Sequence, residues 1–288
     1  MKDKPTNTQR GDQSSGANPP RVTPYLEGRL RRLFDAWLEA TRRRYLPPLT
    51  FSEVRKGVQA LSSLYVERRS GGRIASRASA GEGKRAALAT YYAPLHFLAA
   101  HHALARWGDT LLQGVRGIHD LGCGTGAAGV AAAVLPSAPP ALQAMDRSPW
   151  ALGEAARTAE AFGLAVRTRR GALPAALPRA GAEDLLVLGW VVNELAPDPR
   201  ERLLHGIGSA LGRGARLFLL EPLARSAAPW WSAWAERLAA HGIEDGILRC
   251  GLELPPWIQE MDEACGLDHR ELRARVLLGP AGNARRRV

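Results

Sequence analysis

Apolar residues recur at helical spacing through the first third of the chain. Between residues 24 and 44, leucines and aromatic residues form one helical face and arginines the other, and two prolines then end the helix. A second helix is predicted from Ser52 to Arg69, and a third from Lys84 to Trp107. The segment between these two, Ser70 to Gly83, is small, polar and glycine-rich, so we expect a mobile loop there.

From Gly117 onward, short apolar runs alternate with helical stretches. The runs that read as strands are IHDL, ALQAM, AVRTR, DLLVLGWVV and ARLFLLEP. Helices are predicted between them over residues 127–134, 149–162 and 198–211. This alternation is typical of an α/β fold in which helices cover both faces of a parallel sheet. Because the carboxyl ends of parallel strands meet at one edge, we expect a ligand to bind there.

In the last part of the chain, the apolar pattern predicts two helices, in PWWSAWAERLAAHG and ELPPWIQEMDEACG, and a strand in HRELRARVLLG. The first of these helices carries three tryptophans, Trp230, Trp231 and Trp234. They could form a stacking surface for a ligand or a flipped base. We favour the simpler interpretation, in which this helix packs its apolar face on the sheet.

These patterns divide the chain into a disordered tail over residues 1–23, a basic helical domain over 24–110, a ligand-binding domain over 111–279 and a basic flexible tail over 280–288. The first residues have no apolar core and do not resemble a secretory signal. No apolar run approaches the ~20 residues of a membrane span. The cysteines Cys123, Cys250 and Cys265 form no CxxC pair, which favours a reducing cytoplasm over a disulfide framework.

The net charge of +11 is concentrated in the front third of the chain. Residues 1–110 hold 19 basic and nine acidic side chains, whereas the remainder holds 20 and 19. A basic helical segment beside a nearly neutral domain suggests a polyanionic partner such as RNA. The arginines expected to contact phosphates are Arg42, Arg43, Arg44, Arg68, Arg69, Arg73 and Arg77. An equally good interpretation is that these arginines simply lie on solvent-exposed faces of helices and bind no RNA.

The most informative motif is IHDLGCGTGAAG, from Ile118 to Gly129, which predicts a strand, a glycine turn and a helix. Its glycines, which lack the Cβ atoms that would keep a ligand from the backbone, are Gly122, Gly124, Gly126 and Gly129. The last three spell GxGxxG. Asp146 closes the next apolar run 20 positions after Gly126, where a carboxylate can accept both ribose hydroxyls.

Asp120 helps to distinguish between the cofactors that such a turn can hold. A nicotinamide dinucleotide would place its anionic pyrophosphate over the turn, where this carboxylate would repel it. S-adenosylmethionine has an ammonium, a carboxylate and a sulfonium instead, and these match an acidic strand end followed by bare backbone N–H groups. The motif therefore favours S-adenosylmethionine, with a nicotinamide oxidoreductase as a distant alternative.

The DLGCGTG run resembles the first motif of class I methyltransferases, and Asp146 stands where that family has its ribose-binding acid. The resemblance implies a Rossmann-like sheet with helices on both faces, closed by an antiparallel hairpin and here preceded by the smaller all-helical domain. It also implies S-adenosyl-L-methionine as cofactor. The implied cofactor-binding residues are Asp120, Gly122, Cys123, Gly124, Thr125, Gly126, Asp146, Arg147 and Ala172.

The fourth strand is predicted to end in GWVVNEL, at the edge that would face the transferred methyl group. Trp190, Asn193 and Glu194 are therefore the candidate catalytic residues, because an amide beside a carboxylate can orient an acceptor or take its proton. Asn193 and Glu194 could equally organise a turn before the following proline. Histidines and cysteines show no metal-binding spacing, so no metal site is expected.

Residues 50–222 also resemble, more loosely, a methyltransferase-like family associated with the small ribosomal subunit, through TFSEVRKGVQALSSLYVERR, DRSPWAL, VVNEL and LLEP. That resemblance implies a helical domain bound to ribosomal RNA. Members can carry a four-cysteine iron–sulfur cluster, which three cysteines cannot supply. Three hypotheses result: a methyltransferase acting on ribosomal RNA, a non-catalytic assembly factor of the small subunit, and a small-molecule methyltransferase with a helical lid.

Overall fold

The computed structural model describes residues 23–67, 81–224 and 226–280. The predicted tails over 1–22 and 281–288 and most of the predicted loop over 70–83 lie outside these residues. So do four of the candidate RNA-binding arginines, namely Arg68, Arg69, Arg73 and Arg77. Thr23, at the end of the first predicted tail, forms an isolated bridge with Leu252.

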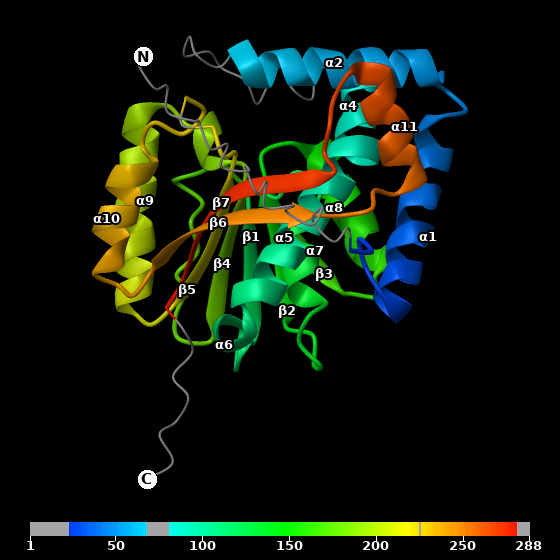
Figure 1. Ribbon diagram of the computed structural model, residues 1–288. Helices are drawn as coiled ribbons and strands as arrows, with labels where there is room; N and C mark the ends of the chain where they lie inside the picture. The colour runs from blue at the N-terminus through cyan, green and yellow to red at the C-terminus, as the bar shows by residue number, and fades with distance from the viewer. Residues whose placement is uncertain (1–22, 68–80, 225, 281–288) are drawn as a thin grey trace, which may run out of the picture.

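Within the described residues, seven strands form one sheet in the order β3-β2-β1-β4-β5-β7-β6 (Figure 1). The strands are β1 Gly117–Leu121, β2 Ala141–Asp146, β3 Val166–Arg170, β4 Asp184–Gly189, β5 Arg216–Glu221, β6 Glu244–Gly251 and β7 Glu271–Gly279. The first five are parallel, and β7 lies antiparallel between β5 and β6. The predicted α/β sheet and the closing antiparallel hairpin are therefore confirmed.

Helices cover both faces of this sheet, as predicted (Figure 1). The helices are α1 Gly28–Tyr45, α2 Phe51–Glu67, α4 Glu82–Ala87, α5 Ala93–Trp107, α6 Asp109–Leu112, α7 Ala127–Ala133, α8 Pro149–Ala161, α9 Pro197–Gly212, α10 Trp231–Ala239 and α11 Pro256–Cys265. A π-helical turn, η2 Leu88–Tyr92, joins α4 to α5 and was not predicted. A 3-10 turn, η3 Val192–Glu194, follows β4.

The central strand β4 shows why the sheet needs helices on both sides. Leu185 and Val187 belong to the hydrophobic cluster that includes α5 and α7, whereas Leu186 and Leu188 belong to the cluster formed with α9 and α10. All four side chains are fully buried. Successive residues of a strand point to opposite faces, so a continuous apolar run fits a strand that is covered twice.

The predicted helical region and the sheet share one hydrophobic cluster. Phe34 and Trp37 of α1 pack against Phe97 of α5, with ring centroids 5.4 and 5.9 Å from that ring. The tryptophans of α10 are also core residues, since Trp231 and Trp234 are fully buried. Their interpretation as an apolar helix face on the sheet is thus confirmed. No helix in the described ranges is long and apolar enough to span a membrane.

Two strand predictions need correction. The strand predicted to run through DLLVLGWVV stops at Gly189, because Trp190 adopts a left-handed backbone with φ of 57° and η3 follows directly. The segment that forms the edge strand β6 was not identified from the sequence, although the resemblance implied a closing antiparallel hairpin. Of its residues, Leu248 is the buried one, and its partly charged sequence gives little periodic signal.

Candidate functional site

The glycine turn joins β1 to α7 and is fixed to the neighbouring strand. The backbone N–H groups of Gly122 and Cys123 both donate to the Met145 carbonyl, at 2.7 and 2.9 Å. Gly122 and Gly124 have φ of 69° and 51°, which glycine adopts readily. A Cβ at Gly122 would lie 2.3 Å from Val191 Cγ2, whereas a Cβ at Gly124 would point into open space. The backbone at Gly124 is therefore accessible to a ligand.

Asp146 stands at the end of β2, where the sequence placed the ribose-binding acid. Its Oδ2 accepts the Gly124 N–H at 3.0 Å, and its Oδ1 accepts the Ser148 N–H at 2.8 Å. Each carboxylate oxygen keeps a second acceptor position. Two backbone donors thus hold this half-buried carboxylate beside the glycine turn, in a position to accept a pair of hydroxyls.

Asp120 lies at the end of β1 and is almost completely buried. Its Oδ2 accepts the Gly129 N–H at 3.2 Å, and a Cβ at Gly129 would lie 2.5 Å from this oxygen. The third glycine of the GxGxxG pattern therefore makes room for Asp120. Burial raises the pKa of Asp120 to about 7; the Gly129 N–H opposes this shift and the nearby Asp146 carboxylate adds to it.

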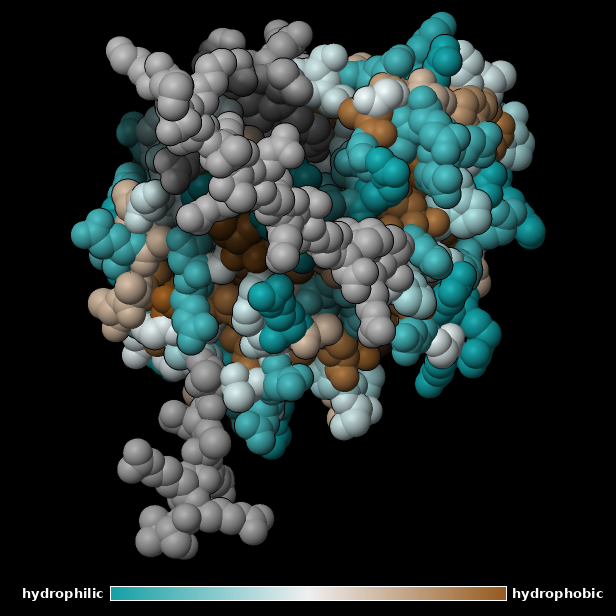
Figure 2. Space-filling model, viewed as in Figure 1, coloured by the Kyte–Doolittle hydropathy of each residue, from teal (hydrophilic) through white to brown (hydrophobic). Residues whose placement is uncertain are grey.

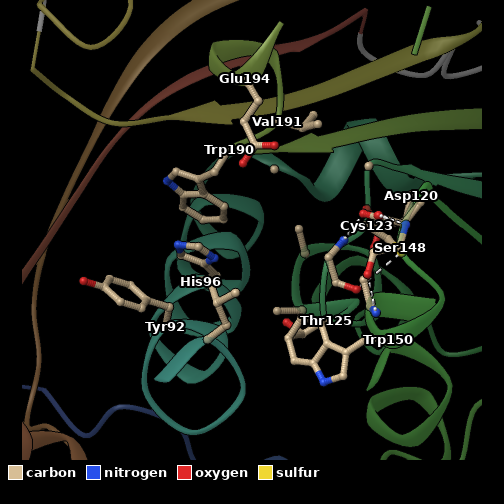
Figure 3. Close-up of a pocket in the computed structure, with 18 residues that line it drawn as sticks. Tyr92, His96, Asp120, Cys123, Thr125, Ser148, Trp150, Trp190, Val191 and Glu194 are labelled. Carbon is tan, nitrogen blue, oxygen red and sulfur yellow. Dashed lines mark hydrogen bonds between the residues drawn. The ribbon is translucent and has the colours of Figure 1, made fainter. Parts of the chain in front are cut away.

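A pocket of about 130 Å³ opens beside the turn (Figure 3). The predicted site residues that line it are Asp120, Gly122, Cys123, Gly124, Thr125, Asp146, Trp190 and Glu194. They come from β1, the glycine turn, β2 and the segment after β4, and the fold brings them together at the carboxyl edge of the sheet. This is the edge at which a ligand was expected.

A smaller hollow of about 90 Å³ shares Gly122, Asp146 and Glu194 with this pocket and extends towards β3. Arg147 and Ala172, two of the three remaining predicted cofactor residues, line it. Gly126 has a different role. A Cβ there would lie 2.9 Å from Ala155 Cα, so this glycine lets the turn pack closely against α8.

The candidate catalytic residues divide into two groups. Trp190 and Glu194 line the pocket. Asn193 turns its amide towards α10, where its Oδ1 accepts the Trp230 Nε1–H at 3.3 Å, and its backbone N–H donates to Glu221 at 3.0 Å. The Asn193 side chain therefore contacts Trp230 and caps neither η3 nor α9.

Sequence reasoning missed three aromatic pocket residues, which lie in helices outside the glycine motif. Tyr92 and His96 come from η2 and α5, and Trp150 from the start of α8 (Figure 3). The His96 ring stacks on Trp190 with centroids 3.8 Å apart and planes 8° apart. Burial lowers the pKa of His96 to about 3, so this ring is neutral near pH 7. A histidine in a largely apolar helix that also carries His101 and His102 gives no signal for this role.

The described candidate RNA-binding arginines contact other parts of the chain. Arg42 lies over the Trp257 ring and pairs with Glu39 at 3.1 Å. Arg44 pairs at 2.5 Å with Glu154, which is buried on α8. Arg43 is largely exposed but also bonds to Glu39. Helix packing thus accounts for Arg42 and Arg44 without RNA.

Comparisons with known proteins bear on the fold. No protein-family model and no curated protein sequence matches the chain. Among solved structures, the mitomycin 7-O-methyltransferase MmcR is similar with a TM-score of 0.51 and 16% identity, over 88% of this chain and 76% of that one. A SAM-dependent methyltransferase from Aquifex aeolicus is also similar, with a TM-score of 0.43 and 16% identity, over 64% of this chain and 90% of that one.

A third similar structure is a TehB-like SAM-dependent methyltransferase from Corynebacterium glutamicum, with a TM-score of 0.40 and 22% identity, over 60% of this chain and 85% of that one. The similarity to the MmcR structure, over 88% of this chain, concerns the fold. The chain has a Rossmann-like methyltransferase fold.

Proposed function

We propose that this protein binds S-adenosylmethionine at the glycine turn and transfers its methyl group. The observation that carries the proposal is the pair of carboxylates at one pocket, the buried Asp120 at the end of β1 and the backbone-held Asp146 at the end of β2. A pyrophosphate over this turn would be repelled by the ionised Asp120 carboxylate at close range. A ligand with an ammonium group and a neutral ribose suits them.

The residues fit this cofactor along the whole pocket. Asp146 is positioned to accept the ribose hydroxyls, and the hollow lined by Arg147 and Ala172 offers space for the adenine. Asp120 lines the same pocket and would lie at the amino-acid end of the cofactor. When bound, S-adenosylmethionine supplies a methyl group activated by its sulfonium. The protein then contributes mainly alignment of the acceptor with that carbon.

Calorimetric titration tests the cofactor assignment directly. S-adenosylhomocysteine should bind the wild-type protein saturably, and NADH should not. Asp146→Ala should weaken binding of S-adenosylhomocysteine by at least tenfold, because two hydroxyls lose a charged acceptor. Asp198→Ala, on the exposed start of α9, is the matched control and should leave the affinity unchanged. Binding of NADH in place of S-adenosylhomocysteine would contradict the proposal.

Ribosomal RNA is a second candidate acceptor, and the charge of residues 1–110 favours it. In Figure 2, hydrophilic residues dominate the side of the molecule formed by α1. If arginines such as Arg43 contact phosphates, affinity for small-subunit RNA should fall steeply as salt rises. Radiolabelled methyl transfer to that RNA would separate an enzyme from an assembly factor, which would bind the RNA without modifying it.

A further inference from the structure

A second and larger cavity, of about 630 Å³, lies beside the cofactor pocket. Tyr92, His96 and Trp190 line both, so the two cavities adjoin at the stacked His96 and Trp190 rings. Much of the remaining lining is apolar, contributed by Leu95, Ala99, Pro222, Leu223, Ala224 and Leu272. The other lining residues are charged or titratable, namely Asp268, His269, Glu271 and Arg273. A cavity of this size with both apolar and polar walls fits a small organic molecule.

One polar group at this cavity is held by a buried network. His269 lines the cavity, and its Nδ1 lies 2.9 Å from Oδ1 of Asp262 on α11. The backbone N–H of His269 donates to the other carboxylate oxygen at 2.8 Å. Tyr91 of η2 donates its hydroxyl to the same Oδ1 and lies 3.1 Å from the imidazole Nδ1. Asp262 is 4% exposed, so the ring is anchored on a buried group.

The protonation states of Asp262 and Tyr91 determine which nitrogen of the His269 ring carries a proton. Burial raises the pKa of Asp262, but hydrogen bonds from His269 and Tyr91 outweigh it and hold the pKa below its ordinary value. Burial and the bond to Asp262 raise the pKa of Tyr91, so its phenol stays protonated. An ionised carboxylate only accepts hydrogen bonds. Nδ1 of His269 therefore carries the proton, and Nε2 is left as the basic nitrogen.

The titratable groups around the imidazole come from several elements. Asp262 belongs to α11, Tyr91 to η2, His96 to α5 and Asp268 to the loop before β7. Asp268 is committed to a two-oxygen pair with Arg270. His96 is neutral, and its ring stacks on Trp190 at the cofactor pocket. Asp262 is thus the group that orients His269.

We infer that the 630 Å³ cavity binds a small-molecule acceptor with a hydroxyl group, and that His269, oriented by Asp262, is the general base that removes its proton. This inference rests on the proposed function. His269 Nε2 takes the hydroxyl proton as the acceptor oxygen forms a bond to the methyl carbon. The bond from that carbon to sulfur breaks, its electron pair stays on sulfur, and the imidazolium releases the proton to water.

The test uses the full-length protein saturated with S-adenosylhomocysteine, and a probe set of phenol, 2-naphthol and a three-ring phenol. Histidine ¹⁵N spectra should show His269 protonated at Nδ1, and at least one phenol should shift its Nε2 signal saturably. With S-adenosylmethionine present, that phenol should be methylated. His269→Ala should lower this transfer by about 100-fold or more. Asp262→Asn should change the tautomer signal and the pH profile of transfer.

Two controls keep the outcomes distinguishable. His205→Ala, on the exposed surface of α9, should change neither spectra nor transfer. Wild type and His269→Ala should bind S-adenosylhomocysteine with the same affinity. If the wild-type protein did not bind S-adenosylhomocysteine, the proposed function itself would be overturned. Normal cofactor binding, with no phenol shifting the imidazole signals, would overturn the acceptor site and leave the proposed function standing. Methyl transfer to small-subunit RNA, with no transfer to any of the phenols, would also overturn the acceptor site.

Discussion

At the scale of single residues, Asp120 affects both the stability of the fold and the charge of the ligand that the pocket favours. Its carboxylate is buried between β1 and α7, and the absence of a side chain at Gly129 makes room for it. A buried carboxylate in a pocket is costly to ionise unless a cation compensates it. The same residue therefore favours a ligand with an ammonium group and makes the fold sensitive to pH.

We predict that Asp120 makes the stability of the ligand-free protein fall as the pH rises towards neutrality. Burial raises its pKa from 3.8 to about 7, so the folded state holds the proton more tightly than the unfolded state. The stabilisation is complete below the unfolded pKa and is lost as the pH rises to the folded one. Urea denaturation of wild type and Asp120→Asn across this window measures it, and Asp120→Asn should lack this component.

Ligand binding should have the opposite pH dependence. An ammonium pairs with the ionised form of Asp120, so affinity for S-adenosylhomocysteine should fall as the pH drops below about 7. Calorimetry in the same buffers compares wild type with Asp120→Asn, which should bind weakly at every pH. Equal affinity of the two proteins would contradict the assignment of Asp120 to the ammonium.

At the scale of elements, α1 helps to build the cofactor pocket through side chains that the sequence presents only as helix surface. The Tyr45 hydroxyl donates to Glu154 at 3.0 Å and accepts the Trp150 Nε1–H at 3.0 Å. Trp150 lines the pocket, and Arg85 of α4 lies 5.8 Å from its ring. The front helices therefore shape the wall opposite His96 (Figure 3).

We predict that Tyr45→Phe weakens S-adenosylhomocysteine binding by about fivefold, because Trp150 loses one hydrogen-bond acceptor worth about 1 kcal/mol. Tyr25→Phe is the matched control, since it removes a hydroxyl that bonds to Asp35 within the front region and does not line the pocket. Both variants should lose similar stability in thermal denaturation. A similar loss of affinity in both would show that the effect is general destabilisation.

At the scale of the whole molecule, the front helices and the sheet should unfold together. Phe34 of α1 is fully buried and packs on Phe97 of α5, within the hydrophobic cluster that also contains β1 and β4 side chains. Phe34→Ala should lower the free energy of unfolding by about 3–5 kcal/mol. Far-ultraviolet circular dichroism and tryptophan fluorescence should follow one coincident transition.

Ile247→Ala provides the control for Phe34→Ala, because Ile247 is 50% exposed on the edge strand β6. That substitution should change the free energy of unfolding by about 0.5 kcal/mol or less. Two separate transitions in wild type would contradict a shared core and would fit independent helical and α/β domains.

The sequence by itself determined the alternating α/β pattern, the glycine turn, and the positions of Asp120 and Asp146 along it. These are local properties, because periodicity and glycine backbone freedom act over a few residues. The tertiary structure decided which residues surround that turn. His269 meets Tyr91 across 178 positions and Arg44 meets Glu154 across 110, contacts that depend on packing of the whole chain and leave no local signal. The tertiary contacts thereby account for Arg42 and Arg44 as packing residues, and they place His269, which the sequence did not single out, beside Asp262 as the candidate base.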